Sequence, residues 1–299
     1  MNIYSQKDSN IRKTWLLLAS FLIFIIAVGW VFSYVYANQS ILIFAVVFSL
    51  VMNFLSYWHS DKIALAINKA ERVERKNATE LYNVIENLAI TAGLPMPKVY
   101  LVRDPAPNAF AIGRNPEKAA IAVTTGLLDL LDRSELEGVI AHELAHVGNR
   151  DILLSTVAVV LAGFIALLSD IFLRSLWWRG SGNDDRRGAG GVLILIGIVL
   201  AVLSPIAATL IRLAISRNRE FLADSSGAML TRYPEGLARA LEKIGKYSAP
   251  MRSANNATAH LWISDPHGKK ISVMSKMFMT HPPIDERITR LRGDRKSVV

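Results

Sequence analysis

The sequence contains no cysteine. It therefore cannot form a disulfide framework, and a zinc site built from cysteine thiolates is excluded. Any zinc ion would have to be bound by histidine and carboxylate side chains. The lack of cysteine fits a reducing compartment but does not require one.

Charged residues are also scarce. They make up 20% of the 299 residues, whereas 52% of the chain is hydrophobic and its mean hydropathy is +0.29. This composition is too apolar for an ordinary soluble enzyme and predicts membrane spans. In a soluble protein the net charge of +9 would leave nucleic acid as a candidate partner. With membrane spans, Lys and Arg on their cytoplasmic flanks explain it better, so we expect a lipid bilayer and no nucleic acid.

Two apolar runs near the N-terminus, Trp15–Tyr36 and Ile41–Trp58, are long enough to cross a bilayer, which takes roughly 20 residues. The first run is too long for a signal peptide and lacks a clean cleavage site, so we expect an uncleaved helix. The link at residues 37–40 carries no charge, whereas both outer flanks are basic. This asymmetry predicts that both flanks lie in the cytoplasm.

Two later apolar runs, Ile152–Ser169 and Val192–Ile211, predict a second hairpin. The connection between them is rich in arginine, which opposes the positive-inside rule. Either the hairpin spans the bilayer despite its arginines, or it is only partly embedded; we favour spanning. The expected organisation is an N-terminal transmembrane hairpin (1–60), the first half of a domain outside the membrane (61–151), the second hairpin (152–211) and the second half of that domain (212–299).

The segment between the hairpins predicts a small α+β unit. Helical periodicity covers Asp61–Arg75 and Thr79–Ala92. Three short strand candidates follow, separated by Pro and Gly, and we expect them to form a mainly antiparallel sheet. These candidates are Lys98–Val102, Asn108–Ile112 and Ala119–Thr124.

A helix with the pattern H-E-x-x-H carries the chemistry. Ser134 and Glu137 form a capping-box pattern that predicts its start. His142 and His146 are four residues apart and share one helix face, so they can bind one cation. Glu143 lies beside that pair, where it can act as the base of a metal-dependent hydrolase.

A catalytic zinc site needs a third protein ligand. The extension H-E-x-x-H-x-x-G-x-x-H fails, because Asn149 and Ile152 stand where Gly and His are required. The other usual solution is a Glu on a second helix, and Glu220 with Asp224 four residues later fits it. Glu220 can ligate the metal and Asp224 can accept a hydrogen bond from a ligand histidine. Since one zinc ion cannot be shared across a bilayer, the chain between His146 and Glu220 must cross the membrane twice or not at all.

These motifs together resemble the M48 family of membrane-bound zinc metallopeptidases, in particular its HtpX-like bacterial members. The resemblance extends over most of the chain and rests on its two N-terminal spans, its apolar hairpin and five motifs. The motifs are Asn108–Ala111, Thr124–Leu128, the HELAH helix, the Arg217–Asp224 segment and Thr280–Pro283.

The resemblance implies one Zn²⁺ per chain, bound by His142, His146 and Glu220. It also implies that Glu143 is the base and that Asp224 accepts a hydrogen bond from a ligand histidine. The expected fold is an α-helical membrane protein with about four transmembrane helices and an α+β zincin-like (gluzincin) catalytic domain containing a small β-sheet. The expected location is the bacterial inner or plasma membrane, multi-pass, with the catalytic domain facing the cytoplasm.

Further candidates surround this constellation. Asn108 and Ala109 lie where the family has an edge strand, and such a strand can pair with an extended peptide. A cationic side chain near the C-terminus, His281 or Arg287, can stabilise an oxyanion. The competing interpretation of Asn108 and Ala109 is an ordinary strand, and that of His281 and Arg287 is a surface turn. The role of Asp151 stays open, and the remaining histidines are expected at the surface or the membrane interface: His59, His260 and His267.

The predicted function is hydrolysis of peptide bonds in membrane or unfolded proteins at the cytoplasmic face. The resemblance implies a role in membrane-protein quality control and stress response. Three alternatives remain: an intramembrane protease, a protease for prenylated peptides, and a non-proteolytic scaffold or transporter subunit. The intramembrane alternative conflicts with the charged residues that lead into the motif helix, and the scaffold leaves Glu143, Glu220 and Asp224 without a purpose. Substrate identity and oligomeric state are not encoded in any motif.

Overall fold

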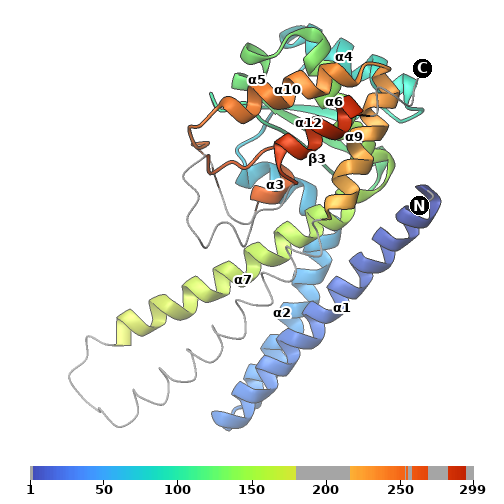
Figure 1. Cartoon of the computed structure of the whole chain (residues 1–299). Coiled ribbons are helices and arrows are strands. Elements are labelled where there is room, and N and C mark those ends of the chain that lie inside the picture. The colour runs from blue at the N-terminus through green and yellow to red at the C-terminus, as the bar shows by residue number, and fades with distance from the viewer. Residues whose placement is uncertain (1–2, 180–215, 253, 255–257, 269–281, 294–299) are drawn as a thin grey trace.

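The structure is a computed structural model. It describes residues 3–179, 216–252, 254, 258–268 and 282–293, and for 3–7 and 166–179 only the backbone. The predicted apolar run Val192–Ile211 and the predicted site residue His281 lie outside this part of the chain. Figure 1 shows long helices extending to one side of a compact body that contains the sheet.

The N-terminal hairpin consists of α1 (Ile3–Val35) and α2 (Gln39–Trp58). In the described part of the chain, Asp8–Val35 and Gln39–Trp58 are the two helices that can each cross a membrane by length and composition. The helices touch at Gly29, where a Cβ atom would lie 2.2 Å from the Cβ of Ala45. Both predicted N-terminal spans are therefore helical.

The third apolar run lies in α7 (Asp151–Arg179), which packs against the hairpin (Figure 1). The shared core joins Leu17 and Phe21 of α1 to Leu154 and Val157 of α7. The helix before it, α6 (Arg133–Gly148), meets α7 at a bend of 85°. The apolar helix α7 is thus separated by only two residues from the helix that carries H-E-x-x-H.

The sheet has four strands in the order β1-β2-β4-β3. The strands are β1 (Glu71–Arg72), β2 (Lys98–Val102), β3 (Ala109–Ile112) and β4 (Ala120–Thr124). β1 pairs with β2 and β3 with β4 in antiparallel fashion, whereas β2 and β4 are parallel. The sheet is therefore mixed, and the expectation of a mainly antiparallel sheet missed its longest pairing.

Strand β1 was not predicted. The helix expected over residues 61–75 is α3 (Ser60–Ile67), which ends where the Asn68 side chain bonds to the Ala64 carbonyl and Lys69 adopts a φ of 52°. Left-handed backbone at a non-glycine residue breaks a helix. After Ala70, Glu71 and Arg72 join the sheet by backbone pairing with β2. A strand of two residues is too short to show an alternating side-chain pattern.

Helices cover both faces of the sheet. On one face, Ile121 and Val123 pack with residues of α4 (Thr79–Thr91), α6 and α10 (Pro234–Lys246). On the other face, Phe110 packs edge-on against Trp262 with ring centroids 4.5 Å apart. The remaining elements of the body are η1 (Arg75–Asn77), η2 (Pro116–Lys118), α5 (Thr125–Leu130), α9 (Arg217–Thr231), η3 (Ala259–Leu261) and α12 (Ile284–Gly293).

The motif helix α6 begins two residues earlier than predicted. Asp132 is the N-cap and accepts a hydrogen bond from the Glu135 backbone N–H at 3.0 Å, while the Glu135 carboxylate accepts one from the Asp132 N–H at 2.9 Å. The Ser134–Glu137 capping box is therefore wrong. Glu135 is 1% exposed and pairs with Lys243 of α10 at 2.6 Å, so a tertiary contact selects this register.

Candidate metal centre

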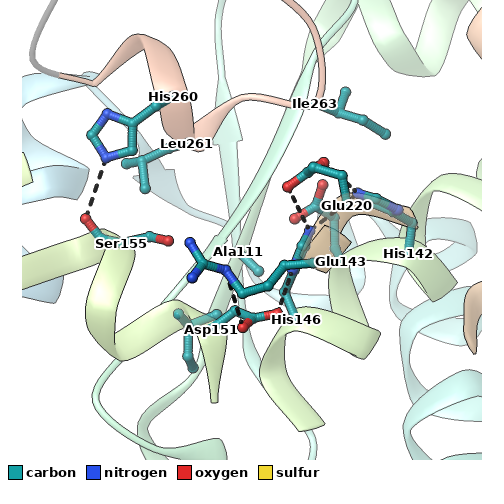
Figure 2. A pocket seen from close by; sticks show the side chains of 12 residues that line it. Ala111, His142, Glu143, His146, Asp151, Ser155, Glu220, His260, Leu261 and Ile263 are labelled. Carbon is teal, nitrogen blue, oxygen red and sulfur yellow. Dashed lines mark hydrogen bonds and ion pairs between the residues drawn. The ribbon is translucent and has the colours of Figure 1, made fainter. Parts of the chain in front are cut away.

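Two helices present the predicted ligands to one point. His142 and His146 project from α6, and Glu220 projects from the first turn of α9. The Nε2 atoms of the two histidines lie 3.2 Å apart. Glu220 places its Oε2 atom 3.7 Å from His142 Nε2 and its Oε1 atom 3.6 Å from His146 Nε2. Figure 2 shows Glu220 reaching toward both imidazoles.

This geometry fits a zinc ion. Ligand atoms of a tetrahedral zinc site lie about 2.0–2.1 Å from the metal, so any two of them are roughly 3.3 Å apart. The three donor atoms here lie within 4.8 Å of one another. Two neutral imidazoles and one carboxylate are also a donor set that catalytic zinc uses, with the fourth position left for water or substrate.

The Nδ1 atom of each histidine, on the side of the ring away from Nε2, contacts a carboxylate oxygen. Asp224 Oδ1 lies 2.9 Å from His142 Nδ1, and Asp151 Oδ2 lies 3.1 Å from His146 Nδ1. A histidine whose Nδ1–H donates to a carboxylate keeps the Nε2 lone pair directed at the metal. Asp151, whose role the sequence left open, therefore lies behind His146 as Asp224 lies behind His142.

The pKa values of these groups reflect their burial. Burial lowers the pKa of His142 to about 4, which keeps this imidazole neutral, as a metal ligand must be. Burial also tends to lower the pKa of His146, but Glu220 and Asp151 outweigh it and raise the value to about 9. A cation that binds His146 therefore displaces a proton from it.

Glu143 lies beside the ligands and is 2% exposed. Burial raises its pKa to about 7. A carboxyl group with a pKa near the working pH can both accept and release a proton. Glu143 lines the same cavity as the ligands, opposite His260 and Ser155 (Figure 2).

Arg287 of α12 is fully buried and forms a bidentate ion pair with Asp224. Its Nη2 atom lies 2.6 Å from Asp224 Oδ1 and its Nε atom lies 2.9 Å from Asp224 Oδ2. Burial tends to lower the pKa of this guanidinium, but Asp224 outweighs it and raises the pKa. The described residues that line the cavity do not include Arg287. The geometry thus favours a supporting position behind Asp224, and the oxyanion role predicted for Arg287 or His281 stays a prediction.

The predicted edge strand is at the edge of the sheet, as β3, but it is buried rather than exposed. Ile263 covers part of it by donating its N–H to the Ala109 carbonyl at 3.0 Å. The Asn108 amide is also engaged, since it donates to the Ser264 carbonyl at 2.9 Å. Of this strand, Ala111 lines the cavity. Peptide binding by Asn108 and Ala109 stays a prediction.

Two polar residues of the site, His260 and Arg219, were not predicted from the sequence. His260 was expected at the surface or the membrane interface, which is wrong: it is 6% exposed, lines the cavity, and lies 3.4 Å from the Ser155 carbonyl. Arg219 is 4% exposed and its Nε lies 3.5 Å from Asp151 Oδ1. His260 lies in no recognisable motif. Arg219 directly precedes the predicted ligand Glu220, so its position in the sequence could have indicated a place in the site.

The sequence of this chain is similar to those of known proteins. A sequence profile of Peptidase family M48 matches residues 75–295. The chain is 49% identical to a Protease HtpX homolog of Caldanaerobacter subterraneus subsp. tengcongensis, over 97% of each chain. It is 43% identical to a Protease HtpX homolog of Streptococcus gordonii, over 97% of this chain and 99% of the relative.

Among solved structures, the crystal structure of S. mikatae Ste24p is similar, with 20% identity, a TM-score of 0.49, and coverage of 96% of this chain and 67% of that chain. This likeness is too distant to add to the assignment. The profile match and the two full-length relatives carry it. The chain belongs to peptidase family M48, as an HtpX-like, membrane-bound metalloprotease.

Proposed function

We propose that the chain is a zinc metalloendopeptidase that hydrolyses membrane or unfolded proteins at the cytoplasmic face of a bacterial inner membrane, in quality control and stress response. The observation that carries the proposal is the convergence of His142, His146 and Glu220 beside the buried carboxyl group of Glu143. His142, His146 and Glu220 would hold one Zn²⁺ per chain. When bound, zinc supplies Lewis-acid polarisation of the scissile carbonyl and lowers the pKa of water.

The protein supplies the proton transfers. Glu143 removes a proton from the attacking water as its oxygen bonds to the carbonyl carbon. It then delivers that proton to the amide nitrogen as the C–N bond breaks, so one water molecule is added across the peptide bond. Asp224 and Asp151 keep both imidazoles oriented throughout, because each accepts a hydrogen bond from an Nδ1–H group.

The proposed topology has four membrane crossings, with residues 1–60 and 152–211 as two hairpins and residues 61–151 and 212–299 as the two halves of a gluzincin-type catalytic domain. Support comes from the position of the ligands along the chain. α6 carries two ligands before the second apolar stretch, and α9 carries the third ligand after it. An even number of crossings keeps both helices on one side of the bilayer.

The test compares full-length wild type with Glu143→Gln after removal and return of zinc. We expect both proteins to bind one zinc ion per chain and only wild type to cleave an unfolded polypeptide, with a loss of about 10²–10⁴-fold in the variant. Glu137→Gln is the matched control, because Glu137 lies on the same helix and pairs at the surface with Arg133. Cleavage by Glu143→Gln at the wild-type rate would refute the mechanism, and a wild type without zinc would refute the cofactor.

A further inference from the structure

A polar residue of the first membrane helix reaches the metal centre. Asn10 lies in α1, before the apolar run begins at Trp15, and is 2% exposed. Its Nδ2 group donates to Asp151 Oδ1 at 2.5 Å and to the Asn149 carbonyl at 3.3 Å. A carboxamide has two N–H donors, and these two bonds use both of them.

The other oxygen of Asp151 faces a ligand. Asp151 Oδ2 lies 3.1 Å from His146 Nδ1. The contacts therefore form a chain from Asn10 through Asp151 to His146. A carboxylate that is itself held by fixed donors can orient an imidazole, whereas a freely rotating one cannot. Asn10 thus bears on the direction of His146 Nε2 without touching the imidazole.

The same contacts span the bend between the metal helix and the membrane helix. α6 ends at Gly148, α7 begins at Asp151, and the helices meet at 85°. Arg150, inside the bend, has a φ of 57°, a conformation that non-glycine residues rarely adopt. Asn10 bonds to Asn149 before this residue and to Asp151 after it, so it holds both sides of the bend.

The two histidines differ in where their support comes from. Behind His142, Asp224 is gripped by Arg287 of α12, within the body that contains the sheet. Behind His146, Asp151 is held by Asn10 of α1 and lies 3.5 Å from Arg219 of α9. The His146 side of the site is thus tied to the N-terminal membrane helix.

We propose that Asn10 is a positioning residue of the metal centre. It fixes the Asp151 carboxylate that orients His146, so the cytoplasmic end of α1 completes the site in addition to anchoring the chain. The inference rests on the proposed zinc site. It assigns a role to a residue that lies outside both ligand motifs and outside the residues matched by the family profile.

The decisive substitution is Asn10→Leu, which has a similar volume and no donors. The control is Thr14→Val: Thr14 is also buried, one turn further along α1, and its hydroxyl donates to the Asn10 carbonyl. Full-length proteins in detergent would be titrated with zinc against a chromophoric chelator, and with cobalt for the visible spectrum. Loss of a residue behind a ligand typically weakens metal binding about 10–100-fold. We expect that loss and an altered cobalt spectrum in Asn10→Leu, and wild-type behaviour in Thr14→Val.

A double-mutant cycle separates positioning from general damage to the fold. If Asn10 acts through Asp151, then Asn10→Leu adds no further loss of zinc affinity in an Asp151→Ala background. Wild-type zinc affinity in Asn10→Leu, or full additivity with Asp151→Ala, would overturn the inference while leaving the zinc site intact. A wild-type protein that binds no zinc would instead overturn the proposed function and this inference with it.

Discussion

Gly227 of α9 lies directly against the backbone of His142 in α6. A Cβ atom on Gly227 would come within 2.9 Å of the His142 nitrogen and 3.1 Å of its Cα. Both neighbours are backbone atoms inside a helix, so neither can move aside alone. The close approach of the two ligand-bearing helices therefore depends on the missing side chain.

Gly227→Ala is expected to push α9 away from α6. Overpacking of this kind costs about 1–3 kcal/mol of stability, and it also moves Glu220 away from the histidines. We expect a lower unfolding temperature and weaker zinc binding, measured by thermal unfolding and by chelator competition. Gly148→Ala is the control, because its nearest described atom is Leu94 Cδ1 at 3.8 Å. Equal behaviour of the two variants would contradict the packing argument.

Glu220→Ala tests the third ligand. Removal of a direct donor should weaken zinc binding by more than the 10–100-fold typical of residues behind a ligand, so we expect a loss of at least about 100-fold. The measurement is zinc affinity of the purified full-length chain. Met229→Ala, on the same helix but 77% exposed, should bind zinc as wild type does. Undiminished zinc affinity in Glu220→Ala would remove Glu220 from the ligand set.

Arg287→Leu tests the buried ion pair behind His142. Removing the guanidinium leaves the Asp224 carboxylate buried without its main partner, which typically costs 3–5 kcal/mol. We expect the free energy of unfolding, measured with denaturant, to fall by about that amount. Arg290→Leu is the matched control on α12, since Arg290 is half exposed and pairs with Glu286 at the surface. The Arg290 guanidinium also lies 3.5 Å from the centre of the Phe221 ring. The expected cost of Arg290→Leu, from the surface pair and this contact together, is at most about 2 kcal/mol. Similar costs for both variants would show that the buried pair has no special weight.

Single cysteines test the proposed orientation, because the natural chain has none and every label reports one site. Gln39→Cys lies at the start of α2 and Glu80→Cys lies in α4, and both positions are exposed. A maleimide that cannot cross membranes should label Gln39→Cys in intact cells, and Glu80→Cys only after the membrane is opened. Labelling of Glu80→Cys in intact cells would place the catalytic domain outside.

Much of the site follows from local geometry. The spacing of His142 and His146 fixes them on one helix face, and the spacing of Glu220 and Asp224 does the same on another helix. Positions i and i+4 of any α-helix share a face, so both pairs can be recognised from the sequence. The apolar runs can also be recognised from the sequence, because a helix that crosses a bilayer needs a minimum number of consecutive apolar residues.

Other features depend on contacts between distant segments. Asp132 and Ser134 are both good N-caps, and the contact between Glu135 and Lys243 decided between them. Strand order is likewise a long-range property: β2 and β4 pair in parallel although β3 lies between them in sequence. The sequence offers both capping boxes, Asp132 with Glu135 and Ser134 with Glu137, without choosing between them, and no local pattern encodes the strand order.

Two histidines, a base and a distant carboxylate, in the pattern of a membrane-bound metallopeptidase, can be read from the amino-acid sequence. That α6 and α9 meet closely enough at Gly227 to bring three donors within 4.8 Å of one another follows from the packing of the folded chain. The packing also places Arg287 against Asp224 and Asn10 against Asp151. Ligand spacing along one helix is a local property, whereas the side chains that support each ligand come together only when separate helices pack.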